Sequence, residues 1–273
     1  LFCSLEGKEI ALTFDDVPWG TTGLFTMEKR IEILLAKLDE AHVQGAFFCV
    51  GEQIERKGGK AALEQIERKG HFLANHSYSH LHLSGLTIAE FALEIERTEE
   101  LLKNYSSYRR WFRFPYLDYG GRVHLGGSRQ KQRKAFSLLE EKGYAHGYPT
   151  INTFDWYLNS CLVKALQEDR QINFKKLKDL YLFFLEKWID GFARNFHSDA
   201  KHILLLHGND INALYLDALI DLLHKKGWTL ISPEVAYAQE KAIAKPKVFQ
   251  APSSLCCDYI DAIVSSSAVF SNR

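Results

Sequence analysis

The feature that most constrains the fold is the alternation of short apolar runs with longer amphipathic segments along most of the chain. Seven runs of four or five residues are rich in β-branched and aromatic residues, as buried strands are. They span residues 10–14, 46–50, 72–75, 111–114, 144–148, 203–207 and 228–231. Helical periodicity lies between them, at 27–41, 87–103, 130–142, 174–193 and 212–225.

This alternation predicts a parallel sheet, and 273 residues suit a distorted (β/α) barrel of about seven parallel strands. We expect the domain to cover residues 1–244. Beyond it the pattern breaks into Pro, Ser and short apolar pieces, so residues 245–273 are expected to form a C-terminal extension. The longest stretch between two strand candidates runs from 155 to 201. Its insertion at 157–201 is a candidate lid or substrate wall.

Composition narrows the range of partners. Lys plus Arg and Asp plus Glu both number 34, so the formal net charge is zero and indicates no nucleic-acid partner. No apolar run approaches the roughly 18 residues of a transmembrane segment. Five cysteines without CxxC spacing indicate neither a disulfide framework nor a thiolate metal site. The chain begins with Leu1 rather than Met, so we expect a trimmed signal peptide and a secreted or periplasmic location. Oligomeric state stays open.

Two adjacent carboxylates, Asp15 and Asp16, follow the first predicted strand. Neighbouring side chains in a strand point to opposite faces, so the two acids can take different roles only where the strand ends and the backbone turns. By themselves they also fit a solvated acidic turn, because loops are rich in Asp.

Two histidines, His76 and His80, stand four residues apart after the third predicted strand. On one helical turn they would face the same way and bind one divalent ion through imidazole nitrogens. The pair alone is also common on surfaces. With a carboxylate from Asp16, it completes three ligands and an open position, the pattern of a catalytic metal site. We therefore predict a divalent metal, zinc by preference.

Polar residues also follow three later strand candidates. Arg113 lies in the sequence RFPY and supplies a permanent bidentate donor suited to a carboxylate, although a surface ion pair is the alternative. Asp155 and Trp156 follow the fifth predicted strand, and they fit a helix N-cap beside a core aromatic as well as they fit a functional site. His207 ends an apolar strand, where a lone histidine is usually structural.

These groups all lie at predicted strand ends, and their order along the chain resembles that in one family. The sequences TFDD, HSYSH, RFPY, NTFDW and LLLHG resemble the five motifs of the polysaccharide deacetylases, carbohydrate esterases that include chitin, peptidoglycan and nodulation-factor deacetylases. They extend from Thr13 to His207, most of the chain. The resemblance implies a deacetylase-type barrel and a metal-dependent hydrolase that removes acetyl groups from N-acetylated amino sugars. The expected partner is an acetylated carbohydrate.

The resemblance also implies the role of each residue at the reaction centre. Asp15 resembles the general base and His207 the general acid. Asp16, His76 and His80 resemble the metal ligands. The chemistry agrees with these roles, because water activated by a metal needs a base and a leaving amine needs a proton.

Further residues resemble the supporting groups of the family. Arg113 resembles the residue that holds the base, and the backbone N–H of Tyr116 resembles an oxyanion donor. Asp155 resembles a partner of either the acid or Arg113. Trp156 resembles a pocket wall, and Leu205 resembles part of the pocket for the acetyl methyl group.

The chain departs from the family pattern at two positions. Val17-Pro18-Trp19 stands where Gly commonly follows the paired acids, and Asn152 stands where Asp commonly begins the fourth motif. Gly lets the backbone turn freely, so Val17 changes the expected shape of the first loop.

Three other functions stay open at this stage. An O-acetyl esterase or a small-molecule amidase would use the same site, because attack on the carbonyl is common to all of them. A non-catalytic carbohydrate-binding relative would have lost the base or the acid, whereas Asp15 and His207 are both present. Acetate release from chitooligosaccharide, peptidoglycan and acetylxylan separates these functions.

Overall fold

The structure is a computed structural model of the 273-residue chain and describes residues 8–20, 22–197 and 199–239. The C-terminal extension expected at 245–273, and with it the boundary at 244, lies outside the described residues. Within the described part of the chain, no helix combines the length and the apolar character needed to cross a bilayer.

Eight parallel strands form one curled sheet in the order β5-β4-β3-β2-β1-β7-β6, and β8 pairs with the first residues of β1. Their bounds are β1 Lys8–Val17, β2 Gly45–Cys49, β3 Phe72–Asn75, β4 Tyr108–Phe112, β5 Ala145–His146, β6 Ile151–Asn152, β7 Lys201–His207 and β8 Trp228–Leu230. In the described residues no ladder joins β5 to β6, so the barrel is open on that side. The expected distorted barrel is confirmed.

Each of the seven predicted strands corresponds to an observed one, and β6 is the strand that the prediction missed. β6 has two residues, too few to show any periodicity. Its pairing with β7 places Asn152 beside Leu205. The correction matters because β6 leads directly into the fourth motif.

Nine α-helices and three single-turn 3₁₀ helices connect the described strands. The α-helices are α1 Met27–Glu40, α2 Gly51–Glu55, α3 Gly59–Arg68, α4 Ile88–Leu102, α5 Arg129–Glu141, α6 Asp155–Gln167, α7 Phe174–Ala193, α8 Asp210–Lys225 and α9 Pro233–Tyr237. The 3₁₀ helices are η1 Leu83–Gly85, η2 Pro115–Leu117 and η3 Val123–Leu125.

Side-chain caps define where several of these helices begin. The side chain of Thr87 accepts a hydrogen bond from the Glu90 backbone N–H, and the Glu90 carboxylate accepts one from the Thr87 N–H, which makes a capping box. Asn173 and Asn209 are the N-caps of α7 and α8. The side chain of each accepts one hydrogen bond from a backbone N–H in the first turn of its helix. The segment expected to contain one helix before β7 contains two, α6 and α7.

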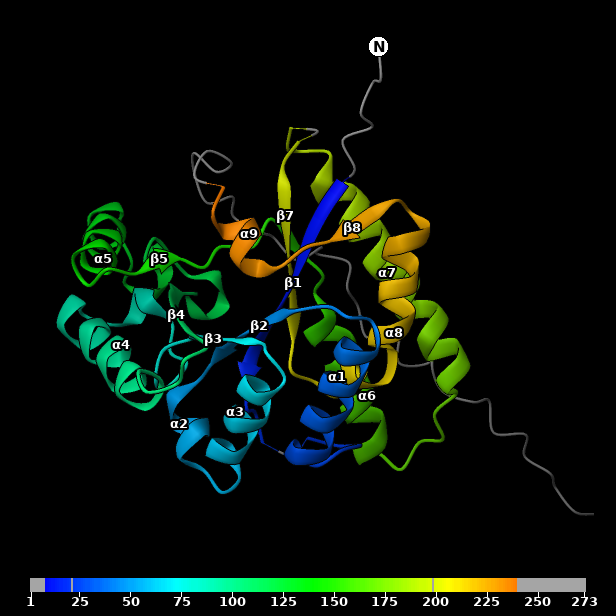
Figure 1. The fold of residues 1–273 in the computed structure, drawn as a ribbon. Coiled ribbons are helices and arrows are strands. Elements are labelled where there is room, and N and C mark those ends of the chain that lie inside the picture. The colour runs from blue at the N-terminus through cyan, green and yellow to red at the C-terminus, as the bar shows by residue number, and fades with distance from the viewer. Residues whose placement is uncertain (1–7, 21, 198, 240–273) are drawn as a thin grey trace, which may run out of the picture.

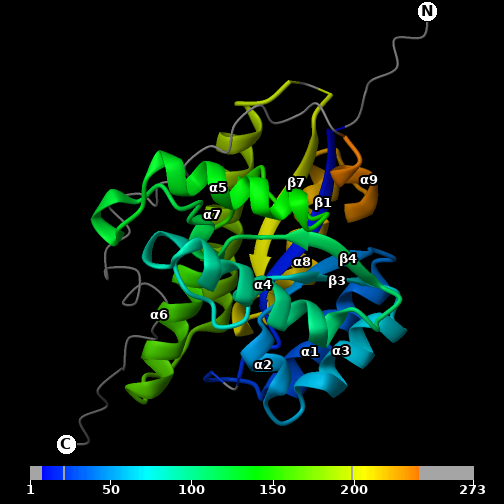
Figure 2. The same ribbon diagram turned by 90° about the vertical axis from the view of Figure 1, so that its left-hand side faces the viewer.

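The helices surround the sheet unevenly (Figure 1). α4 and α5 lie at the β4–β5 end, whereas α7 and α8 lie at the β7 end. Both views show α6 near the carboxyl ends of β1 and β7, whereas α9 lies beside the amino-terminal halves of these strands (Figures 1 and 2). α6 is therefore the helix placed to border a site at the strand ends.

Strand alternation sorts the side chains of β1 between two environments. Leu12 and Phe14 are fully buried in the main hydrophobic core, which also contains residues of α1 and α8. Thr13 and Asp15 point to the other, concave face, because successive strand residues alternate. In the β1–β7 register Asp15 lies opposite His207. The strand period thus brings these two residues to one face of the sheet.

Candidate active site

Asp16 reaches the site because β1 is distorted next to it. The strand continues through both acids to Val17, but the register with β2 shifts between Phe14 and Val17 and Asp16 has a φ of 60°. A bulge of this kind redirects a side chain. Asp15 and Asp16 can therefore serve one site although the strand does not end between them.

Asp16, His76 and His80 converge, with one potential ligand atom from each lying within 4.8 Å of the others. Asp16 Oδ1 is 3.0 Å from His80 Nε2 and 3.5 Å from His76 Nε2. Ligand atoms around a tetrahedral ion bound at about 2.1 Å lie about 3.4 Å apart. The observed spacing is close to that value.

The chemistry of the donors also fits a divalent ion. Asp16 Oδ1 is buried and makes no hydrogen bond, although two ring nitrogens lie near it. His76 Nδ1 donates a hydrogen bond to the backbone oxygen of Arg113 (2.9 Å), which leaves the Nε2 lone pair facing Asp16. Burial alone would raise the pKa of Asp16, but His76 and His80 hold it well below its usual range. An ionised carboxylate and neutral imidazoles are the forms that bind metal.

The two histidines do not lie on a helical turn, so that part of the prediction was wrong. Residues 76–80 form a loop in which Ser77 and His80 have positive φ angles. The Glu94 carboxylate holds this loop by accepting hydrogen bonds from the backbone N–H groups of Tyr78 (3.0 Å) and Ser79 (2.7 Å). The backbone path, rather than helical spacing, turns both imidazoles toward Asp16.

Asp15 is held by a fully buried arginine. Arg113 Nη1 donates to Asp15 Oδ1 at 2.5 Å, and its other donors bind Thr13 Oγ1, the Gly147 carbonyl and Tyr237 Oη. Burial opposes the charge on Arg113, but the Asp15 carboxylate outweighs it and raises the pKa of the guanidinium. Tyr237 lies on α9, and nothing in the sequence marked it as part of this site.

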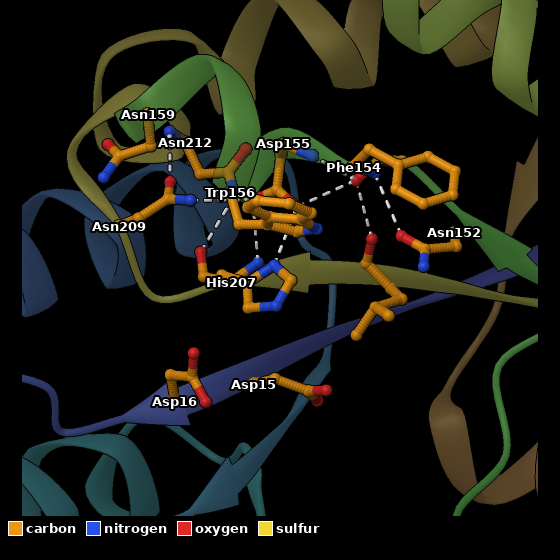
Figure 3. Close-up of polar contacts among 12 residues, drawn as sticks. Asp15, Asp16, Asn152, Phe154, Asp155, Trp156, Asn159, His207, Asn209 and Asn212 are labelled. Atoms are coloured by element: carbon orange, nitrogen blue, oxygen red, sulfur yellow. Dashed lines mark hydrogen bonds and ion pairs between the residues drawn. The ribbon is translucent and has the colours of Figure 1, made fainter. Parts of the chain in front are cut away.

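His207 is paired with Asp155. The two side chains are joined by a 2.8 Å hydrogen bond from His207 Nδ1 to Asp155 Oδ1, and Figure 3 shows His207 between Asp155 on one side and Asp15 and Asp16 on the other. Burial lowers the pKa of His207, but Asp155 and then the two site carboxylates raise it to about 9. Of the two partners expected for Asp155, the structure gives the acid rather than Arg113.

Two asparagines complete the environment of Asp155 and were missed by the sequence analysis. Asn209 Nδ2 and Asn212 Nδ2 donate to Asp155 Oδ2 at 2.8 and 2.6 Å, and Tyr181 Oη donates to Asn212 Oδ1. The available signal was that Asn209 directly follows the His207-Gly208 pair and that Asn212 stands three residues further on. Burial raises the pKa of Asp155, but His207, followed by hydrogen bonds from Thr153 and Asn209, lowers it below its usual value.

The remaining predicted residues border the same space. The Tyr116 ring lies 4.6 Å from the His80 ring, and Tyr116 has a φ of 56°, so the RFPY loop is turned at this residue. Leu205 is 3% exposed. It stands two residues before His207 on β7, so its side chain lies on the same face of the sheet. Trp156, in the first turn of α6, is 43% exposed and lines a pocket together with Asp16 and His207.

A buried ion pair between α1 and α8 fixes the loop that follows Asp16. Arg30 Nη1 lies 2.9 Å from Asp210 Oδ1, with side-chain exposures of 1% and 0%. Arg30 Nη2 donates to the carbonyls of Trp19 and Gly20, while Asp210 accepts from the Thr22 hydroxyl. We call Arg30, Asp210 and Thr22 the loop clamp.

Asp210→Asn is expected to lower the free energy of unfolding by about 3–5 kcal/mol, because it leaves the Arg30 charge buried without its partner. The matched control is Asp217→Asn, which breaks the Lys37–Asp217 pair between the same two helices. Asp217 is 58% exposed, so its loss should cost less than about 1 kcal/mol. Urea unfolding of both variants measures the difference, and equal losses would contradict the structural role of the clamp.

The fold and the site together define a class of protein. The chain is a parallel, barrel-type α/β protein whose polar cluster lies where the strands end, as hydrolytic sites in such folds do. Residues 4–134 match the family model described as polysaccharide deacetylase. This match spans just under half of the chain, and together with the relatives described next it supports the polysaccharide deacetylase family.

Individual relatives agree with this family. The peptidoglycan-N-acetylglucosamine deacetylase of Bacillus cereus is 35% identical over 109 residues, which cover 40% of this chain and 36% of that protein. The chain thus spans about a third of the length of this curated relative. Among solved structures, the chitin deacetylase of Colletotrichum lindemuthianum has a TM-score of 0.59 at 21% identity and covers 84% of this chain and 87% of its own. A CE4 family pseudoenzyme from Bacillus anthracis has a TM-score of 0.60 at 18% identity, with 85% and 66% covered.

Proposed function

We propose that this chain is a divalent-metal-dependent hydrolase that removes acetyl groups from N-acetylated amino sugars in a polysaccharide or oligosaccharide. The observation that supports it most is the convergence of Asp16, His76 and His80 beside Asp15 and His207. The deacetylases among the relatives agree with it. Because such polymers lie outside the cytoplasm, a secreted or periplasmic location is part of the proposal.

Asp16, His76 and His80 would hold the ion, with zinc as our preferred metal. When bound, the ion supplies Lewis-acid polarisation of the acetyl carbonyl and of the attacking water. Asp15 takes a proton from that water, and Arg113 keeps its carboxylate oriented through the 2.5 Å contact. The Arg113 hydrogen bond goes to Oδ1, so Oδ2, which lies 3.7 Å from His76 Nε2, is the oxygen for this task.

The leaving side of the reaction uses different residues. Asp155 accepts a hydrogen bond from the Nδ1–H of His207, so Nε2 is the nitrogen that faces the substrate and donates a proton to the departing amine. The Tyr116 backbone N–H is our candidate donor to the oxyanion, and Leu205 and Trp156 are our candidates for the walls around the acetyl group.

Acetate release from three substrates tests the proposal. Zinc-loaded protein should release acetate from chitooligosaccharide or peptidoglycan, lose this activity with a chelator and regain it with zinc. Release from acetylxylan alone would favour the esterase alternative. Absence of release from all three substrates by metal-loaded protein would favour a non-catalytic relative, a state that the pseudoenzyme among the structural neighbours represents.

A further inference from the structure

The turn after β4 places two successive residues with side chains in the left-handed backbone region. Tyr116 has a φ of 56° and Leu117 has a φ of 48°. This region is unfavourable for any residue that carries a Cβ. Such a backbone persists only where the surrounding structure holds it, and it is concentrated at functional sites. The contacts that hold this turn therefore bear on function.

The turn sets the direction of the Tyr116 backbone N–H. Its neighbours are closed within the turn, since the N–H groups of Leu117 and Asp118 donate to the carbonyls of Phe114 and Pro115, both at 3.0 Å. Across the described residues, the Tyr116 N–H itself donates to no backbone or side-chain acceptor. It is thus available to a bound substrate, and its aim depends on what fixes the turn.

The ring of Tyr116 is held by a histidine rather than by the core. Tyr116 is 52% exposed, so core packing alone does not fix it. Its ring stacks on the His82 ring with centroids 3.9 Å apart and planes 16° apart. The contact with His80 is looser, at 4.6 Å and 57°. A fixed ring fixes the Cα–Cβ direction of Tyr116 and, with it, the backbone turn.

His82 is in turn held by a buried carboxylate. His82 Nδ1 lies 3.3 Å from Asp118 Oδ2, although this pair lacks the geometry of a hydrogen bond. Asp118 is 1% exposed and accepts hydrogen bonds from the Ser84 N–H (3.0 Å), the Ser84 hydroxyl (2.7 Å) and the Gly120 N–H (3.0 Å). These bonds make Asp118 a rigid support for the His82 ring.

We propose that His82 is a positioning residue, whose ring holds the Tyr116 turn so that the Tyr116 N–H faces the oxygen of the acetyl carbonyl. The proposal rests on the proposed function and adds to it a residue outside the five motifs. His82 does not touch the reacting atoms in this role. Its effect passes through Tyr116, and Asp118 keeps its ring in place.

Variants of His82 test the role of its ring in turnover. Zinc-loaded His82→Ala should lose about 10-fold to 100-fold in kcat for amide hydrolysis, because misplacement by about 1 Å can cost about 100-fold. KM should change little, since an oxyanion donor acts mainly in the transition state. Metal content should stay the same. His82→Phe keeps a flat ring in the stack and should restore most of kcat.

The matched control is His124→Ala, which removes an exposed histidine from the nearby η3 and should leave kcat unchanged. His82→Leu, which keeps bulk without a flat ring, replaces His82→Ala if thermal unfolding shows that the latter is not folded. Crystal structures of the variants give a readout that does not depend on activity. The φ of Tyr116 should leave the positive region in His82→Ala and stay there in His82→Phe.

The outcomes separate the two possible failures. If the wild-type protein releases acetate and His82→Ala keeps its kcat, the positioning role is overturned and the proposed function stands. A Tyr116 φ that stays positive in His82→Ala, loss of zinc from that variant, or failure of His82→Phe to restore kcat also overturns the role. If metal-loaded wild-type protein releases no acetate, both proposals are wrong.

Discussion

Asp15→Asn is expected to keep the metal and to lose turnover by a factor of about 100 to 10,000, the usual contribution of a general base. Asn has nearly the same shape as Asp but cannot accept the proton of water at neutral pH. The ligand set of Asp16, His76 and His80 stays complete in this variant. Metal content by elemental analysis and acetate release on the same sample provide the test.

Asp16→Asn is the matched control for this experiment, because it changes the neighbouring carboxylate in the same way. It should weaken metal binding, since a neutral amide replaces an anionic ligand. Asp15→Asn also leaves the Arg113 guanidinium buried without its charged partner, so circular dichroism must establish that the variant is folded at the assay temperature. If Asp15→Asn lost the metal and Asp16→Asn kept it, the two acids would have the opposite roles.

His207→Ala should reduce amide hydrolysis by about 100-fold to 10,000-fold while metal content stays the same. An amine expelled without a proton is prohibitively basic, so the amide needs an acid on its leaving side. An activated aryl acetate has a leaving group that needs no proton and should lose far less activity. Parallel assays of both substrates measure the ratio, and equal losses would leave His207 with a structural role only.

Asp155→Asn adds a pH signature to this experiment. Among the groups that raise the pKa of His207 to about 9, the Asp155 carboxylate has the largest effect. An acid works below its pKa, so activity is lost as the pH rises through that value. Removal of the charge lowers the pKa of His207, and the alkaline limb of the pH–rate profile should therefore move to lower pH. A bound divalent ion moves this limb in the same direction in both proteins, because its charge disfavours the imidazolium.

Local patterns in the sequence were sufficient for much of the fold and for the location of the site. Strand and helix periods depend on neighbouring residues, so seven of the strands and the helices from 27 to 41 and from 87 to 103 were predictable. Carboxyl ends of parallel strands meet at one edge of a sheet, so residues at these ends were expected to gather. The alternation of strand residues also places Asp15 and His207 on one face.

Long-range contacts decided the rest. The bulge that turns Asp16 inward depends on β1 pairing with β2, and the loop path of His76 and His80 depends on Glu94 of α4. Arg30 and Asp210 are 180 residues apart, and each alone has the appearance of an ordinary helix charge.

The partners of the predicted residues were also decided by contacts between distant segments of the chain. The sequence left Asp155 with two possible partners, and only the approach of α6 to the end of β7 selected His207. Tyr237 reaches Arg113 from α9, a helix that begins 120 residues later in the chain. A sequence states which residue types stand at strand ends. Packing between distant segments determines which of them meet, because hydrogen bonds and ion pairs act over a few ångströms in space regardless of separation along the chain.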